Sequence, residues 1–119
     1  MVTNMKFDNG IITGIMRVTD RYQVTDNMDL SRLVLSRVVL HVQERTRGHS
    51  HKGQDEVYIF LFGQGFMVVG NETFSVRTGD IILVPEGEFH QVINGGDTDL
   101  VWCSVYNTNN DSTTEYANE

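Results

Sequence analysis

Two of the four histidines in this 119-residue chain are separated by a single residue, in the stretch RGHSHKGQDE. In a β-strand, side chains two positions apart point to the same face, so His49 and His51 could reach one metal ion together. Glu56 follows five residues after His51, beyond a glycine-containing turn, and its carboxylate could swing back beside the two imidazoles. Asp55 is adjacent and is an alternative ligand from the same turn.

A further candidate ligand lies in a separate segment of the chain. His90 follows the stretch PEGEF, in which Pro85 and Gly87 could fix a tight turn at the mouth of a strand. Three neutral imidazoles and one carboxylate suit Fe, Mn, Ni, Co, Cu or Zn, and the single cysteine cannot build a thiolate zinc site. His41 is outside this set and is expected to be a satisfied or exposed side chain.

The elements that must position these residues have the pattern of β-strands. The apolar runs are LVLSRVVLHVQE, EVYIFLF, FMVVGNETFSV, DIILVP, FHQVIN and LVWCSVY. Glycine-containing turns separate them about every ten residues, and Gly70-Asn71 is typical of a hairpin turn. The one helical pattern, DNMDLSRL over 26–33, is short and weak. The chain is therefore expected to form an all-β sandwich or barrel.

The spacing of these residues resembles the two sequence motifs of the cupin family. The matching positions of the two motifs are His49, His51, Glu56 and Gly63, then Gly79, Pro85, Gly87, His90 and Asn94. The first glycine of the first motif is replaced by Gln43, a change that concerns the local backbone rather than the site. The gap over 64–78 between the motifs is short, as in small single-domain microbial cupins.

This resemblance implies a double-stranded β-helix (jelly-roll) barrel with the metal ligands His49, His51, Glu56 and His90. Four protein ligands leave two positions on a six-coordinate metal for water or substrate. Tetrahedral zinc would be saturated, whereas catalytic zinc sites usually keep one position open. The expected metal is therefore Fe, Mn or Ni, with Zn, Co or Cu as alternatives.

Strand parity suggests which other side chains line the interior. Tyr58, Phe60 and Phe62 share the parity of Glu56 and are expected to face inward with it. Simple core packing is the alternative for each aromatic ring. Tyr58 lies two residues from a ligand, where a phenol could orient substrate or act as an acid or base. We therefore take Tyr58 and Glu56 as the catalytic candidates, while the inward face of the strand over 102–106 stays open.

Three functions are compatible with such a site. The first is a metal-dependent enzyme that isomerises or epimerises a sugar or sugar derivative, in which Tyr58 or Glu56 would move the proton. The second is an iron-dependent dioxygenase or a lyase that uses the same ligands. The third is a non-catalytic barrel that only holds a ligand, because fold alone does not define function.

Length suggests one domain with two peripheral segments. Residues 1–25 form an N-terminal segment in which GIITGIM could be an extra edge strand, and 26–106 form the barrel. The polar tail over 107–119 is expected to be mobile, or ordered only against another part of the protein or a second subunit.

Charge and hydropathy indicate which partners and which location to expect. A net charge of −7 argues against nucleic acid or an anionic membrane as a partner. No apolar run approaches the ~20 residues of a membrane helix, and the N-terminal residues do not resemble a signal peptide. We expect a cytoplasmic protein that takes a small-molecule substrate. A homodimer is also expected, by analogy with the family and because a small barrel has sheet edges to cover.

Overall fold

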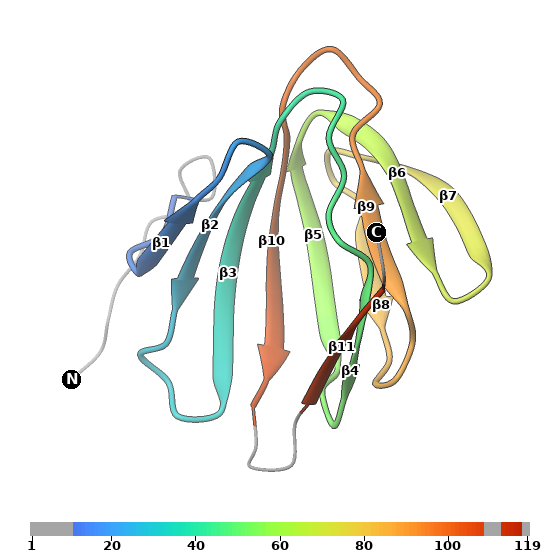
Figure 1. The fold of residues 1–119 in the computed structure, drawn as a ribbon. Helices are drawn as coiled ribbons and strands as arrows, with labels where there is room; N and C mark the ends of the chain where they lie inside the picture. Colours follow the sequence, from blue (N-terminus) through green and yellow to red (C-terminus); the bar gives the residue numbers. More distant parts are fainter. Residues whose placement is uncertain (1–10, 109–112, 118–119) are drawn as a thin grey trace.

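The computed structural model describes residues 11–108 and 113–117, which form two antiparallel β-sheets and contain no helix (Figure 1). The strands of the six-stranded sheet are, in spatial order, β1 (Ile15–Val18), β2 (Tyr22–Asn27), β3 (Leu33–Leu40), β10 (Leu100–Asn107), β5 (Glu56–Phe62) and β8 (Ile81–Val84). Those of the five-stranded sheet are β11 (Thr113–Tyr116), β4 (His49–Lys52), β9 (His90–Ile93), β6 (Gln64–Val69) and β7 (Glu72–Arg77). The predicted all-β class is confirmed.

The core lies between the two sheets and follows from the alternation of side chains along each strand. On β3, every second residue from Val34 to Leu40 is buried, while the residues between them are half-exposed. Phe60 and Trp102 from one sheet meet Met67 from the other in a single apolar cluster. Fully burying one such side chain stabilises the fold by about 1.5–3 kcal/mol.

Glycines occupy the turns that need a left-handed backbone. Gly63, Gly79 and Gly87 all have positive φ, as expected for turn positions. At Gly63, a Cβ atom would lie 2.4 Å from the carbonyl oxygen of Asp99, so no other residue fits there. The predicted hairpin is also present, because β6 and β7 pair across the two-residue turn Gly70-Asn71.

Gln43 keeps the backbone conformation that a glycine would adopt. Its φ is 64°, and it is the one non-glycine with positive φ in the part of the chain that the structure describes. The Gln43 side chain donates hydrogen bonds of 2.9 Å to the carbonyl oxygens of both Gly95 and Gly96. These bonds offset part of the strain of about 1–2 kcal/mol that a side chain meets in this region.

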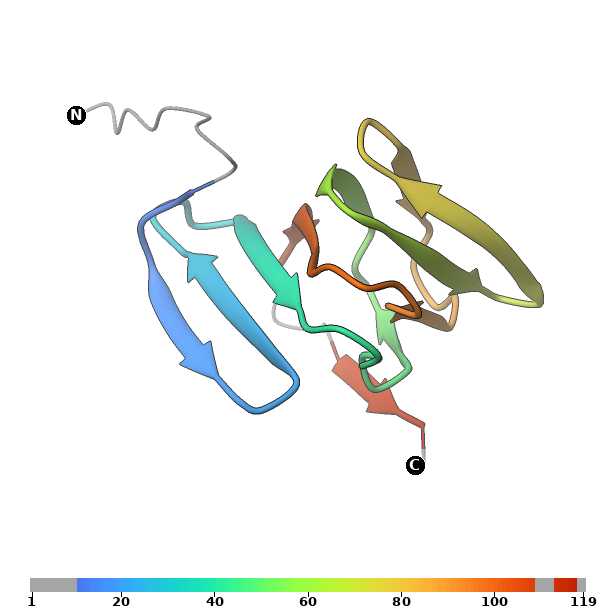
Figure 2. The same ribbon diagram turned by 90° about the horizontal axis from the view of Figure 1, so that it is seen from above.

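The N-terminal region differs from the sequence-based expectation. The weak helix over 26–33 is wrong, because Asp26 and Asn27 end strand β2 and the following residues form a bend. The edge strand near GIITGIM is β1, which begins at Ile15 and so overlaps only the end of that stretch. Seen from above, β1 and β2 extend the six-stranded sheet away from the five-stranded one (Figure 2).

The polar tail contains a strand. Within 107–119, β11 pairs antiparallel with β4 along its whole length, so this part of the tail lies against another part of the same chain. The remaining tail residues, 109–112 and 118–119, are outside the described residues. In the described part of the chain, no helix is long and apolar enough to cross a membrane.

Candidate metal centre

Four side chains converge at one end of the space between the sheets. They are His49 and His51 from β4, His90 from β9 and Glu56 from β5, and their candidate ligand atoms all lie within 4.8 Å of one another. Glu56 Oε1 is 3.4 Å from His51 Nε2 and 3.3 Å from His90 Nε2. Because the histidines belong to one sheet and the carboxylate to the other, an ion at this point would join the two sheets.

Local backbone features bring the histidines together. The alternation of β4 directs His49 and His51 to the inner face, and His49 is the register partner of His90 across β4 and β9. The turn that begins at Pro85 lies against β4, because the Gly87 N–H donates a 2.8 Å hydrogen bond to the His51 carbonyl oxygen. This turn therefore fixes the start of β9 relative to both histidines of β4.

The Nδ1 atom of each histidine in the cluster has a hydrogen-bond partner. His49 Nδ1 lies 3.1 Å from the Arg47 carbonyl oxygen, and His90 Nδ1 lies 3.0 Å from that of Glu88. A carbonyl can only accept, so both Nδ1 atoms carry a proton, which leaves Nε2 as the ring nitrogen that can bind a metal. His51 Nδ1 lies 2.9 Å from the Thr114 hydroxyl oxygen. Metal-binding histidines are held in this way.

Burial and mutual contacts set the charges in the cluster. Burial, together with the neighbouring His90 and His51, lowers the pKa of His49 to about 4, so this imidazole is neutral at pH 7. Burial by itself would raise the pKa of Glu56, but the side chains of His51 and His90 lower it to about 2. The cluster thus holds a carboxylate and a neutral imidazole at pH 7, as a divalent metal requires.

Two buried atoms in the cluster lack a hydrogen bond. Glu56 Oε1 and His90 Nε2 are fully enclosed, and their 3.3 Å separation does not have the geometry of a hydrogen bond. Buried polar atoms are normally satisfied, and leaving one unpaired costs about 1–3 kcal/mol. A metal ion bound to both atoms would satisfy them. The residues present therefore fit a transition metal, and nothing in the donor set selects among Fe, Mn, Ni, Co, Cu and Zn.

The structure separates the alternatives that the sequence left open around this cluster. Glu56 points into the cluster, whereas exposed Asp55 accepts a hydrogen bond from the Glu86 backbone N–H. His41 is outside the cluster and its Nδ1 lies 3.2 Å from Asp99 Oδ1.

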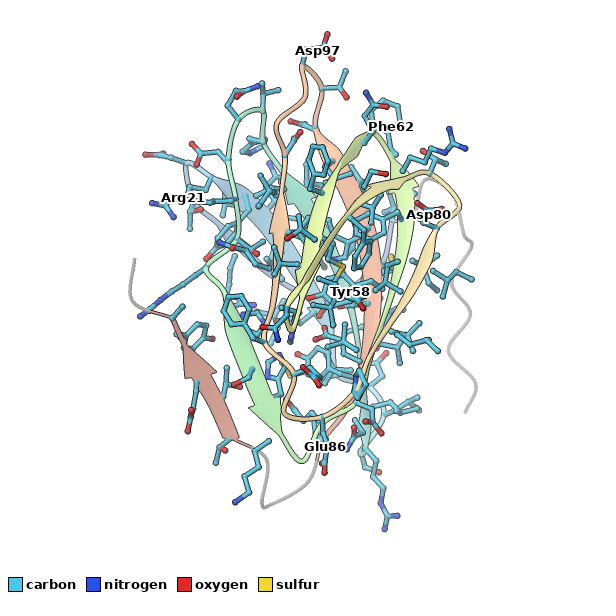
Figure 3. The ribbon with its side chains drawn as sticks, turned by 90° about the vertical axis from the view of Figure 1, so that its right-hand side faces the viewer. Arg21, Tyr58, Phe62, Asp80, Glu86 and Asp97 are labelled. Carbon is cyan, nitrogen blue, oxygen red and sulfur yellow. The ribbon has the colours of Figure 1, made fainter. Side chains whose placement is uncertain are left out.

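The three aromatic residues of β5 that were predicted to face inward differ in their burial. Tyr58 is buried, with its ring 5.9 Å from both His90 and Trp102 (Figure 3). Phe60 is buried in the core as expected. The inward placement of Phe62 is wrong, because β5 has one extra residue between the pairs Phe60–Trp102 and Phe62–Val101, which breaks the alternation and leaves Phe62 55% exposed.

Two residues at the cluster were not expected as site residues. Tyr106 is the register partner of Glu56, and its ring is stacked 6.3 Å from that of His51. Its shared parity with Trp102 was visible in the sequence, but the pairing of β10 with β5 was needed to place that face inward. Thr114 had no signal in the sequence, because it lies in the polar tail.

A comparison with known protein families assigns the chain. The family model described as the cupin domain matches residues 36–106, which is more than half of the chain. The chain therefore belongs to the cupin family, and its two sheets form the double-stranded β-helix that the motifs predicted.

Individual relatives cover parts of the chain. An uncharacterised protein of Methanocaldococcus jannaschii is 34% identical over 73 residues, 60% of this chain and 58% of that protein. A protein of Thermotoga maritima named as oxalate-binding is 33% identical over 57 residues, 48% of this chain and 47% of that protein. The chain thus spans about half the length of the curated relatives it matches.

Among solved structures, a sugar phosphate isomerase of the cupin superfamily from Silicibacter pomeroyi superposes with a TM-score of 0.78. The two sequences are 22% identical, and the match covers 97% of this chain and 83% of the other. At this identity the likeness concerns the fold.

Proposed function

We propose that this cupin is a metal-dependent enzyme that isomerises or epimerises a small polar metabolite, a sugar or sugar derivative. The observation that carries the proposal is a row of buried polar side chains beside the histidine cluster, on the inner face of the six-stranded sheet. The name of the structurally similar Silicibacter pomeroyi protein, a sugar phosphate isomerase, supports the same class of substrate.

The polar row crosses four neighbouring strands. Ser104 on β10 is the register partner of Tyr58 on one side and of Ser36 on the other, and Ser36 is the partner of Asp26 on β2. Asp26, Ser36 and Ser104 are buried. The Ser36 hydroxyl donates to Asp26 Oδ1, and an Arg17 guanidinium nitrogen lies 3.1 Å from Asp26 Oδ2.

Binding of a polar molecule would explain why such a row lies on the inner face of the sheet. The inner face of a β-barrel is normally apolar, because a buried polar group is stable only when it is hydrogen-bonded. Hydroxyl and carboxylate groups in a line are suited to bind the hydroxyl groups of a sugar. The row begins at Tyr58, two residues from Glu56, so a molecule bound along it would reach the cluster.

The protonation states of the chain's own residues suit an isomerisation, which moves a proton between neighbouring carbons. Glu56 is ionised at neutral pH and is the candidate base. Burial and the charge of Glu56 raise the pKa of the Tyr58 phenol well above its usual range, so Tyr58 stays protonated and is the candidate acid. A bound divalent metal would supply a Lewis acid that polarises the substrate carbonyl.

The test begins with identifying the metal in protein from its native host by elemental mass spectrometry. Thermal unfolding of protein loaded with Fe(II), Mn(II) or Ni(II) is then followed with and without a panel of sugars and sugar phosphates. We expect stabilisation by one compound that requires the metal, and conversion of that compound by NMR. Stabilisation without any conversion would instead identify a non-catalytic binding protein.

A second candidate is the binding or breakdown of a small dicarboxylate, as in an iron-dependent lyase or dioxygenase. It is supported by the similarity to the Thermotoga maritima protein named as oxalate-binding. Two open positions on a six-coordinate metal would accept two carboxylate oxygens. Oxalate in the same thermal screen, and oxygen uptake by the Fe(II)-loaded protein, distinguish this candidate from the first.

We also propose that two copies of the chain pair through the outer face of the six-stranded sheet near β8. The apolar side chains on this face are Ile81, Leu83, Val57, Ile59, Cys103 and Val105. Ile81 and Leu83 are 61% and 69% exposed. These six side chains form an apolar strip without a carboxylate, although the chain carries a net charge of −7. Two copies can therefore meet at this strip without bringing carboxylates together.

A further inference from the structure

Strand β4 carries two of the four clustered side chains and depends on β11 for its pairing. In the described part of the chain, β4 pairs with β9 at a single position, His49 with His90. It pairs with β11 at four positions: Thr113 with Lys52, Thr114 with His51, Glu115 with Ser50, and Tyr116 with His49. The residues of β11 thus lie directly opposite both histidines of β4.

The contact between Thr114 and His51 differs from those of the other histidines. His49 and His90 each direct Nδ1 at a backbone carbonyl, and a carbonyl can only accept a hydrogen bond. His51 Nδ1 instead meets the Thr114 hydroxyl at 2.9 Å, and a hydroxyl can accept or donate. Thr114 also lies outside the segment 36–106 that the cupin family model matches.

Contacts near the end of β11 hold it beside the site without burying it. The Ala117 N–H donates a 2.7 Å hydrogen bond to the Gly48 carbonyl oxygen, and Arg47 Nε donates one of 3.0 Å to the Ala117 carbonyl oxygen. The Arg47 guanidinium lies 4.8 Å above the Tyr116 ring, which is 5.5 Å from the His49 ring. All residues of β11 are exposed, so local contacts rather than core packing keep it in place.

We propose that β11 completes the metal centre: Thr114 is a positioning residue whose hydroxyl oxygen accepts a hydrogen bond from the His51 Nδ1–H, which leaves Nε2 free for the metal. Docking of β11 and metal binding then stabilise one another, since coupling between two binding events is reciprocal. This inference rests on the proposed metal binding, and its experiment separates the two.

The experiment compares affinities of the full-length chain for Mn(II) and Ni(II) by competition with a chelator. Thr114→Val keeps the shape and removes the hydroxyl, and we expect a loss of about 10- to 100-fold, typical for groups that orient a metal ligand. Thr114→Ser keeps the hydroxyl and should bind within about threefold of the wild type. Thr113→Val is the matched control, because Thr113 pairs with Lys52 and should bind like the wild type.

A second readout does not depend on affinity. Long-range nitrogen–proton NMR of the wild type should show the Nδ1–H form of His51, and Thr114→Val should add the Nε2–H form. Metal addition should slow hydrogen exchange of the Ala117 amide, which donates to Gly48. Ala117→Pro removes that donor and should weaken metal binding in a chain that stays folded, since β11 is exposed.

The outcomes separate the two proposals. A wild type that binds neither metal overturns the metal centre and this inference with it. A wild type that binds, together with a Thr114→Val variant of equal affinity and an unchanged His51 tautomer, overturns the inference alone. Equal losses in Thr114→Val and Thr113→Val would also overturn it, because the effect would then come from the strand and not from the hydroxyl.

Discussion

His49 on β4 lies directly opposite His90 on β9, and their imidazole rings are 4.4 Å apart, although the two residues come from different sequence motifs. Both Nδ1 atoms face backbone carbonyl oxygens, so in each ring Nε2 is the nitrogen left for another partner. The two rings are therefore placed to bind a metal ion between them, and the pairing of β4 with β9 sets their relative positions.

The first prediction removes either member of this pair. His49→Ala or His90→Ala should weaken metal binding by more than the roughly 10- to 100-fold expected for groups that only orient a ligand. His41→Ala is the matched control, because His41 contacts Asp99 outside the cluster. Elemental mass spectrometry on folded protein gives the stoichiometry, and full metal content in both cluster variants would refute the site.

The second prediction separates chemistry from packing at Tyr58. Its ring is stacked with Phe60 and Trp102 in the core, so Tyr58→Phe keeps these contacts and removes only the hydroxyl. Metal content and fold should be unchanged. If the phenol transfers a proton, turnover of the compound identified in the thermal screen should fall by about 10²- to 10⁴-fold. Full activity in the variant would leave Tyr58 as a packing residue.

Short-range patterns were sufficient for the histidine cluster but not for its surroundings. The alternation of a strand places His49 and His51 on one face, and motif spacing adds Glu56 and His90, so these residues could be predicted. The row of buried polar side chains beside the cluster could not be predicted in this way. Strand β2 alternates only through Tyr22 and Val24, because the next residue on its inner face is Asp26, so a strand that lines a polar site shows the apolar pattern of a strand only in part.

Long-range pairing explains the other gap between sequence and structure. Thr114 contacts His51 across 63 positions of the chain, and no apolar anchor in the tail predicts that register. The turn at Gln43 is another case, because the replacement of the motif glycine left the local backbone there open. The structure shows a φ of 64°, so Gln43 keeps the left-handed conformation.

The third prediction concerns Asn94, which is fully buried. Its amide donates hydrogen bonds of 3.0 Å to the Leu40 carbonyl and 2.9 Å to that of Thr98, and its Oδ1 accepts one of 3.1 Å from the Gly96 N–H. Asn94→Ala leaves these groups unpaired and should lower the free energy of unfolding by about 3 kcal/mol in urea titrations. Ser75→Ala, at an exposed position, should change it by less than about 0.5 kcal/mol. A loss as small at Asn94 would contradict this account.

The fourth prediction tests the strained turn at Gln43. Gln43→Gly relieves strain but loses the bonds to Gly95 and Gly96, so we expect unfolding free energy to change by less than about 1 kcal/mol. Gln43→Val loses the bonds and keeps the strain in a β-branched residue, and should cost about 2 kcal/mol or more. Equal stability of the two variants would show that the positive φ is not maintained in solution.

The fifth prediction concerns the homodimer. Light scattering at micromolar concentration should give twice the 13.5 kDa chain mass. The Ile81→Lys, Leu83→Lys double variant places two charges on the exposed apolar strip beside β5, where burial of a charge without a partner is strongly unfavourable, so it should be monomeric. Thr73→Lys on β7 is the control, because Thr73 is an exposed polar position of the other sheet, and it should stay dimeric. A monomeric wild type would rule out the dimer, and a dimeric double variant would place its interface elsewhere on the molecule.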